Sequence, residues 1–501
     1  MRAFHEIESP GTIIGSYHQS LQKLGHCCSF RFPLTDMSAH KFSTPETTLS
    51  FEACNGQFYT LESSADIPYS NNPVQDSSSS VSRHFSDYDS PRSVSSFASS
   101  MNLCTSGDCL SISRGVRRNL NTQVIPAFDL KQGLIACARS LSDFDISTAI
   151  SIMGIIEKMV SISGDPIQRL GAYLLEGLRA RMESSGNLIY KKLQCDEPTG
   201  PELMTSMQAL YQICPYWKFA YTSANSVIQE AVKNEPMIHI IDFQIAQGGQ
   251  WVPFIKSVSS WREKPLKIRI TGIDDSQSAI ARGGGLEIIG QRLSIVAEMC
   301  DIPFKFHGVS MMDHEVRPEH LRVLPGEAVV VNLPYVLHHV PDESVSTENY
   351  RDRLLRLVRG LSPRVVTLTE QESNTNTSPF YTRFLETLDY YNAMFESIDV
   401  ARPRGDPQRI KAEQNCVARD IVNMVACEGP ERVERHELLG KWRLRFSMAG
   451  FRQSRLNRSV TDNVLDMLRG EYSHEYQIEE KDGAVYLHWR KRAMVTFSAW
   501  R

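Results

Sequence analysis

The chain has 501 residues, of which 41% are hydrophobic and 22% are charged, and its formal net charge is −4. This length gives room for a large core and for more than one structural unit. The charge balance excludes a polycationic chain, so bulk attraction to nucleic acid or to an anionic membrane is not indicated.

The first residues mix charges with apolar side chains, so we expect no secretory signal there. The sequence has no run of about 18 apolar residues, so we expect no membrane-spanning helix. The 11 cysteines are scattered and form no CxxC pair. Scattered thiols without an export signal indicate a reducing compartment, and we expect no metal site.

Residues 1–118 are predicted to form a disordered, Ser-rich N-terminal tail. Half of residues 77–100 are serine, so this segment cannot bury enough apolar surface to offset its ordering entropy. It could be a phosphorylatable, solvated linker, or its short clusters at 85–88 and 94–98 could be docking motifs. The basic sequence RGVRR at 114–118 could be a nuclear import signal.

Residues 119–218 are predicted to form a leucine-rich helical cap. Apolar residues recur at helical spacing in two runs, which are Leu130, Leu134, Cys137 and Leu141, and then Ile152, Ile156 and Met159. A third helix begins at Asp165 and Pro166, an N-cap followed by proline at the first helical position, and residues 201–212 predict a fourth. These stripes could pack within one domain or could receive a partner helix.

Residues 219–501 are predicted to form an α/β core, because strands alternate with helices. The predicted strands are 237–243, 267–273, 304–309, 328–333 and 364–370, with helices from about 250 and at 286–300. This alternation predicts right-handed crossovers and a parallel, doubly wound sheet.

The last third of the chain adds helices and a late hairpin to this core. Helices are predicted at 379–395, 408–427, 432–449 and near 460–469, the first two within a helical insertion near 376–430. Two strands, 484–489 and 493–499, are joined by a link short enough for an antiparallel hairpin. The fold class is therefore α/β and Rossmann-like, of the class I methyltransferase type, with an α-helical cap.

Ligands of doubly wound folds bind at the carboxyl ends of the strands. The candidate pocket residues there are Asp242, Gly248, Gly249, Asp274 and Asn332. A methyltransferase loop normally has glycine two residues beyond the acidic strand end, where this chain has Gln244, whose side chain would crowd a nucleotide. We therefore expect no cofactor and no catalytic residue, with the two glycines in an ordinary turn. His338 and His339 could supply a base or could hydrogen-bond neighbouring loops.

The segment 432–458 is locally basic. Its cations are Arg432, Arg435, Lys441, Arg443, Arg445, Arg452, Arg455 and Arg458. These side chains could contact phosphates, or they could form a solvated face because several glutamates lie nearby. Trp442, Trp489 and Trp500 are interpreted as anchors of the core.

Three ordered motifs resemble those of the plant GRAS (scarecrow-like) family over residues 120–501. The VHIID motif is matched by Ile238, His239, Ile240, Ile241 and Asp242, with isoleucine in place of the first valine, and the match extends to 251. The PFYRE motif is matched by Pro379, Phe380, Tyr381, Arg419 and Asp420, with aspartate in place of glutamate. The SAW motif is matched by Arg432, Glu437, Trp442, Gly450, Trp489, Ser498, Ala499 and Trp500.

This resemblance implies a nuclear transcriptional regulator that acts as a scaffold for DNA-binding transcription factors and other GRAS proteins. The resemblance implies that the chain could form homo- or heterodimers and that its contact with DNA is indirect or weak. The nucleus is the expected compartment, and the chain could also be present in the cytoplasm. Residues 369–379 and 416–429 look like the phytochrome A signal transduction branch, which suggests light signalling. Two alternatives stay open: an S-adenosylmethionine-dependent small-molecule methyltransferase, and a direct sequence-specific DNA binder.

Overall fold

The computed structural model describes residues 129–183, 200–261, 267–275, 279 and 284–501. The predicted tail and the import-signal candidate lie outside these residues. None of the helices within them combines the length and the apolar character needed to cross a bilayer.

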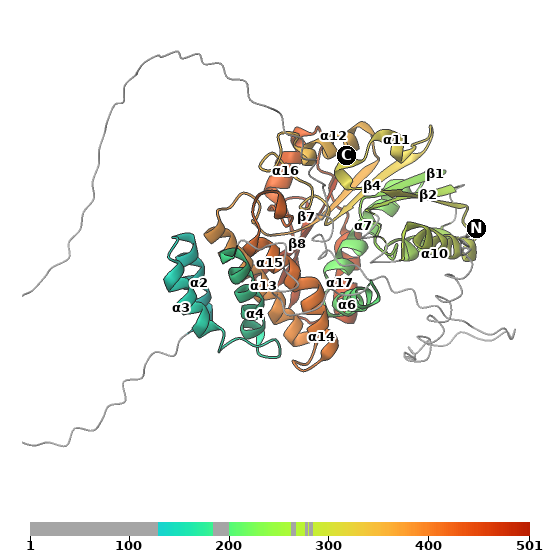
Figure 1. Ribbon diagram of the computed structural model, residues 1–501. Coiled ribbons are helices and arrows are strands. Elements are labelled where there is room, and N and C mark those ends of the chain that lie inside the picture. Colours follow the sequence, from blue (N-terminus) through green and yellow to red (C-terminus); the bar gives the residue numbers. More distant parts are fainter. Residues whose placement is uncertain (1–128, 184–199, 262–266, 276–278, 280–283) are drawn as a thin grey trace, which may run out of the picture. The chain divides into compact units, whose positions relative to one another are not determined.

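The cap begins with helices at the predicted positions. They are α2 (Leu130–Ser142), α3 (Ile146–Ile156), α4 (Pro166–Met182) and α6 (Gly200–Ile213). The Asp165 carboxylate accepts a hydrogen bond from the Gln168 backbone N–H, and the Gln168 side chain accepts one from the Asp165 N–H, which makes a capping box before Pro166. The predicted start of the third helix is therefore confirmed, and α2, α3 and α4 pack side by side (Figure 1).

The described residues form one eight-stranded sheet with the order β3-β2-β1-β4-β5-β8-β7-β6. Its strands are β1 (Met237–Asp242), β2 (Lys267–Asp274), β3 (Phe304–Ser310), β4 (Ala328–Pro334), β5 (Val365–Gln371), β6 (Tyr476–Lys481), β7 (Ala484–Trp489) and β8 (Arg492–Trp500). The first five strands pair in parallel, and β8 pairs antiparallel to both β5 and β7. The predicted fold class and hairpin are confirmed, while β6 was missed because its alternation is weak and charged.

Helices cover both faces of this sheet. They are α7 (Tyr216–Val232), α8 (Trp251–Ser259), α10 (Leu286–Met299), α12 (Tyr350–Gly360), α16 (Leu439–Met448) and α17 (Arg458–Glu471), with the short η3 (Asp313–Glu315) and α11 (Pro318–Leu321). Alternate residues of β1 enter two separate cores: Ile240 packs with α7 and α8, whereas Ile241 packs with α12 and α16. The proposed boundary between cap and core, at 218/219, falls inside α7.

The insertion contains α13 (Phe380–Ala401), α14 (Pro407–Ala412), the π-helical turn η4 (Glu413–Val417), α15 (Ala418–Ala426) and the 3-10 turn η5 (Gly429–Glu431). The helix predicted at 408–427 is therefore interrupted by a wider turn. The prediction of one helix over 432–449 is wrong, since α16 begins only at Leu439. Residues 432–438 are non-helical because their charged side chains bind other segments, as shown below.

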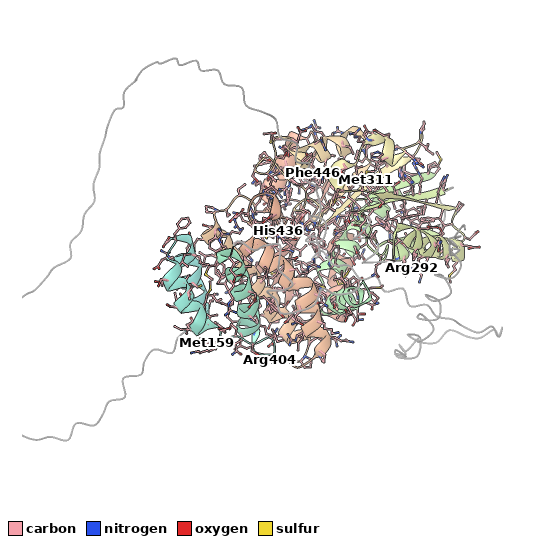
Figure 2. All side chains as sticks on the ribbon, viewed as in Figure 1. Met159, Arg292, Met311, Arg404, His436 and Phe446 are labelled. Carbon is pink, nitrogen blue, oxygen red and sulfur yellow. The ribbon has the colours of Figure 1, made fainter. Side chains whose placement is uncertain are left out.

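Side chains fill the space between the sheet and the helices (Figure 2). Among the labelled residues, His436 lies well inside, whereas Met159 and Arg404 lie at the edge of the structure (Figure 2). His436 is 1% exposed. Polar groups that are buried this deeply must find partners within the protein.

Candidate functional site

Asp242 lies at the carboxyl end of β1 and pairs in register with Asn332 of β4, at the switch point of the sheet. Its carboxylate is buried and accepts hydrogen bonds from Trp251 Nε1 at 2.7 Å, the Gln244 backbone N–H at 3.1 Å and Asn332 Nδ2 at 3.3 Å. Burial raises the pKa of Asp242 to about 6, although these three donors oppose the shift. The residue that a methyltransferase would turn toward its cofactor is thus engaged internally.

The groups next to Asp242 are engaged in the same way. Asn332 Nδ2 donates to Gln250 Oε1 at 3.0 Å, and Asn332 Oδ1 accepts from Thr367 Oγ1 at 2.7 Å. Gln250 Nε2 in turn donates to Asn225 Oδ1 at 3.2 Å. All these residues are buried, and so is Trp251. We call the set of Asp242, Trp251, Gln250 and Asn332 the closed strand-end site, because its polar atoms bind one another.

The other candidate pocket residues lie in turns or in buried positions that the fold itself requires. Gly248 has a φ of +73°, and a Cβ there would lie 3.1 Å from Ile289 and Leu293, so glycine is required for the turn and for packing. Its neighbour Gly249 follows in this turn before α8, and Asp274 is buried at the end of β2. In the amide orientation that satisfies both of its ends, the Gln244 side-chain nitrogen donates to the Pro334 carbonyl oxygen at 2.7 Å. The predicted crowding of a nucleotide by Gln244 stays a prediction.

A second buried cluster surrounds His338. Its Nδ1 lies 2.6 Å from Glu370 Oε2, and its ring lies 4.3 Å from the ring of His436. Glu434 lies 3.1–3.5 Å from the Nε2 atoms of His338, His339 and His436. Burial raises the pKa of Glu370 to about 8 and lowers that of His338 well below its usual value. Of the described residues, these are the ones whose nitrogen and carboxylate atoms lie close enough to hold a metal ion.

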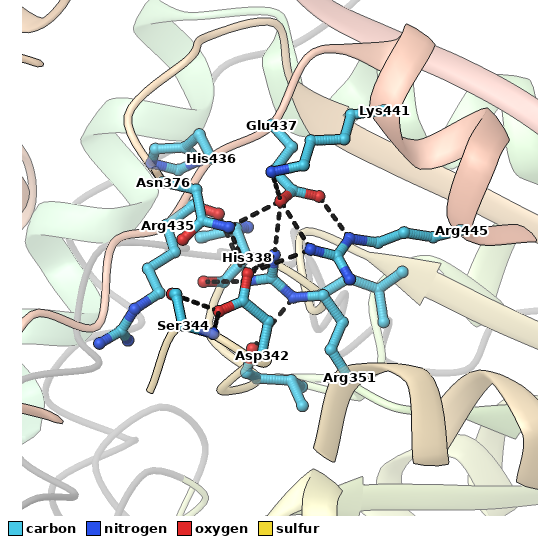
Figure 3. A network of polar contacts seen from close by, with 12 residues as sticks. His338, Asp342, Ser344, Arg351, Asn376, Arg435, His436, Glu437, Lys441 and Arg445 are labelled. Atoms are coloured by element: carbon cyan, nitrogen blue, oxygen red, sulfur yellow. Dashed lines mark hydrogen bonds and ion pairs between the residues drawn. The ribbon is translucent and has the colours of Figure 1, made fainter. Parts of the chain in front are cut away.

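A third cluster joins the loop after β4 and helix α12 to helix α16 and the residues before it (Figure 3). Arg445 Nε donates to Glu437 Oε2 at 2.7 Å, and Arg445 Nη2 donates to Asp342 Oδ2 at 3.1 Å. Arg351 lies 3.3 Å from Glu437 and 3.4 Å from Asp342. Burial alone would raise the pKa of Glu437, but the neighbouring arginines lower it to about 2. We call Asp342, Arg351, Glu437 and Arg445 the ion-pair network.

Sequence reasoning missed this ion-pair network. The sequence indicated that the cations of this basic segment form a solvated face or contact phosphates. In the structure, however, Arg432, Arg435 and Arg445 are buried. The signal that could have found them is the density of glutamate and histidine between the arginines, since buried charges require partners.

The predicted PFYRE and SAW residues lie mostly in buried, structural positions. Phe380 and Tyr381 begin α13, where Tyr381 Oη accepts a hydrogen bond from Arg139 at 3.4 Å. Arg419 and Asp420 are buried on α15. The Trp500 ring stacks on Phe446 at 4.6 Å.

The remaining SAW residues hold turns and strand contacts. Trp500 Nε1 donates to Ser498 Oγ at 3.0 Å, and Ala499 is buried beside them in β8. Trp489 packs on Tyr476 with their rings 4.8 Å apart. Gly450 has a φ of +88° just beyond α16. The predicted role of the tryptophans as core anchors agrees with their burial.

One face of α3 is apolar and exposed. Ile146, Ile150 and the preceding Phe144 are 42%, 52% and 87% exposed, while Ala149, Met153 and Ile156 on the other face are buried. We call Phe144, Ile146 and Ile150 the α3 apolar surface. A contiguous exposed apolar patch is a surface that another protein can cover.

The chain was compared with known proteins. The model of the GRAS domain family matches residues 130–501. Scarecrow-like protein 13 of Arabidopsis thaliana is 58% identical over 75% of this chain and 71% of its own length. Scarecrow-like transcription factor PAT1 of Arabidopsis thaliana is 56% identical over 76% of this chain and 77% of its own length. The crystal structure of SCL7 from Oryza sativa matches with a TM-score of 0.67 and 31% identity, over 75% of this chain and 100% of that one.

These similarities confirm the resemblance found in the motifs, including its branch, because PAT1 is among the most similar relatives. They also agree with the parallel sheet and its antiparallel hairpin. The chain therefore belongs to the GRAS domain family and is a plant transcriptional regulator of the scarecrow-like type.

Proposed function

We propose that this chain acts in the nucleus as a protein-interaction scaffold for DNA-binding transcription factors and other GRAS proteins, in light signalling. The single observation that carries this proposal is the α3 apolar surface, with Phe144 87% exposed and Ile150 52% exposed. An apolar face of this kind fits the apolar side of a partner helix.

The closed strand-end site favours the scaffold over the methyltransferase alternative. The carboxylate that ends β1 is directed inward, because both oxygens of Asp242 accept hydrogen bonds from within the chain. Turning Asp242 outward would leave the buried Trp251 N–H without its partner, which is costly. We infer that the Rossmann-like core serves as a framework.

Direct DNA binding through the basic segment is less well supported. Three of its cations, Arg432, Arg435 and Arg445, are buried and bind backbone carbonyls or carboxylates. Arg452, Arg455 and Arg458 are exposed, and Arg458 lies near Asp462. A few exposed arginines provide too few phosphate contacts for strong binding.

The test uses the full-length chain with two matched double variants. Phe144→Asp with Ile150→Asp places charges on the α3 apolar surface, and aspartate tolerates the φ of 61° at position 144. Leu444→Asp with Met448→Asp is the control, since these residues of α16 are 65% and 81% exposed. Each protein is co-purified with a differently tagged second copy and with a panel of plant DNA-binding transcription factors.

The proposal expects at least a tenfold loss of partner recovery for the α3 variant and an unchanged recovery for the α16 control. Both variants should retain the circular dichroism spectrum of the unmodified chain. Recovery that is equal for the two variants, or that is lost only with the α16 control, would contradict the proposed surface.

A further inference from the structure

A cavity of about 490 Å³ lies between the loop before α13, the loop after β4 and the segment that follows α15. Four arginines and one glutamate supply all the formal charges of its lining: Arg181, Arg383, Arg432, Arg435 and Glu428. We call it the arginine pocket. None of the residues of the closed strand-end site lines it.

The positive charge of the arginine pocket is only partly neutralised. Glu428 Oε1 accepts from Arg181 Nη1 at 2.8 Å and from Arg383 Nη2 at 2.5 Å, and Glu428 Oε2 lies 3.9 Å from Arg432 Nε. One carboxylate is thus shared by three guanidinium groups. With the fourth arginine included, the lining carries an excess of three formal positive charges.

Arg435 is the least compensated of these cations. It is 1% exposed, and its Nε has no hydrogen-bond partner. Its hydrogen bond goes to the carbonyl oxygen of Gly429, and within the described residues no carboxylate forms an ion pair with it. Figure 3 shows its guanidinium group pointing away from the ion-pair network. Such a buried, unpaired cation is costly unless a ligand completes its surroundings.

Two further features bear on the charge of the pocket. Burial and the neighbouring cation Arg351 lower the pKa of Arg435 to about 10, while the carboxylates of Asp342 and Glu434 oppose this shift. Helix α13 begins at the pocket with Phe380, and its N-cap residue Pro379 provides no side-chain cap. The first turn of this 22-residue helix adds partial positive charge and N–H groups at the same place.

We propose that the arginine pocket binds a phosphate monoester dianion. Planar guanidinium groups form paired hydrogen bonds with phosphate oxygens, and two negative charges match the excess better than one carboxylate or one DNA phosphodiester would. The Phe380 ring lies 3.7 Å from the guanidinium carbon of Arg181 and gives the pocket an apolar wall, which suits a phosphorylated side chain.

The phosphate could come from a phosphorylated protein segment or from a small phosphate, and the experiment separates these sources. The Ser-rich stretch of the chain itself supplies the probe, a labelled peptide of residues 84–96 phosphorylated at Ser90. The same peptide without phosphate is the control ligand, and inorganic phosphate is the competitor. Binding to the full-length, unphosphorylated chain is followed by fluorescence anisotropy and calorimetry.

The protein variants are Arg435→Gln, Arg181→Gln and the control Arg458→Gln, which lies outside the pocket and is exposed. We expect the phosphopeptide to bind at least tenfold more tightly than the unphosphorylated peptide, and inorganic phosphate to displace it. Arg435→Gln and Arg181→Gln should each weaken binding at least tenfold, with no effect of the control. Arg181 is partly exposed, so its variant remains informative if Arg435→Gln does not fold.

Calorimetric binding of inorganic phosphate that depends on Arg181, without binding of the phosphopeptide, would support the same chemistry with a small phosphate as the source. Equal affinity for the two peptides would overturn the proposal. The proposal would also fail if both pocket variants bound the phosphopeptide as tightly as the unmodified chain. It would fail as well if duplex DNA displaced the peptide at a lower concentration of phosphate groups than inorganic phosphate does.

Discussion

The closed strand-end site and the arginine pocket bury polar groups in opposite ways. At the strand ends, Asp242 accepts three hydrogen bonds and Trp251 and Asn332 donate to it. In the arginine pocket, the Glu428 carboxylate is shared by three arginines, and Arg435 forms no ion pair with a carboxylate among the described residues. The polar groups at the place where a Rossmann-like fold usually binds a ligand therefore have partners within the chain, whereas the pocket beside the helical insertion has an excess of positive charge.

The largest expected effect lies at the closed strand-end site. Trp251→Ala removes a fully buried ring and a donor to Asp242, so we expect the free energy of unfolding to fall by about 3–5 kcal/mol. Trp251→Phe keeps most of the ring and loses mainly the hydrogen bond, with an expected loss of about 1–3 kcal/mol. Urea titration followed by circular dichroism measures both, and equal losses would show that the hydrogen bond, not the packing, dominates.

The ion-pair network should be nearly as sensitive, and its sensitivity should depend on pH. Glu437→Gln removes one of the two buried carboxylates that Arg351 and Arg445 share, the other being Asp342, and we expect a loss of roughly 3 kcal/mol at pH 7. In the folded, unmodified chain the pKa of Glu437 is about 2, below its ordinary value of 4.5. The stabilisation that the ionised Glu437 provides is therefore complete above pH 4.5 and is lost as the pH falls toward 2.

Unfolding of the unmodified chain and of Glu437→Gln at several pH values tests this. The difference between their free energies should shrink steadily between pH 4.5 and pH 2. A difference that stays constant over this range would mean that Glu437 does not titrate as its ion pairs require.

How far the sequence predicted these regions depended on the pattern involved. The apolar run at 237–243 and the Asp165–Pro166 start produced a strand and a helix where they were expected, because both signals are local. The expectation that Gln244 makes the strand-end loop unlike a cofactor loop stays a prediction. The extended path of 432–438 could not be predicted, since it depends on partners such as Thr375, whose carbonyl oxygen accepts from Arg432.

The stability of the chain should respond far less to a change in the arginine pocket than to one at the strand-end site. Arg435→Met replaces an unpaired buried cation by an apolar side chain of similar length and loses one hydrogen bond to Gly429. We expect its free energy of unfolding to stay within about 1 kcal/mol of the unmodified chain without phosphate. A loss of about 3 kcal/mol or more in urea titration would show that Arg435 is already well compensated, and the contrast between the two regions would fail.

The smallest expected effect is that of Arg181→Gln on stability. Its ion pair with Glu428 is partly solvated on both sides, so we expect a loss of a few tenths of a kcal/mol. The midpoint of thermal unfolding should change by about 1 °C or less. A larger change would show that the main role of Arg181 is to stabilise the packing of α4 against the segment after α15.

The central claim is that the core of this GRAS chain is a framework whose strand-end site is filled by its own side chains. Calorimetric titration of the full-length chain with S-adenosylmethionine tests it most directly. The account predicts only the heat of dilution at ligand concentrations up to the millimolar range. Binding at micromolar concentration that is abolished by Asp242→Ala would contradict it.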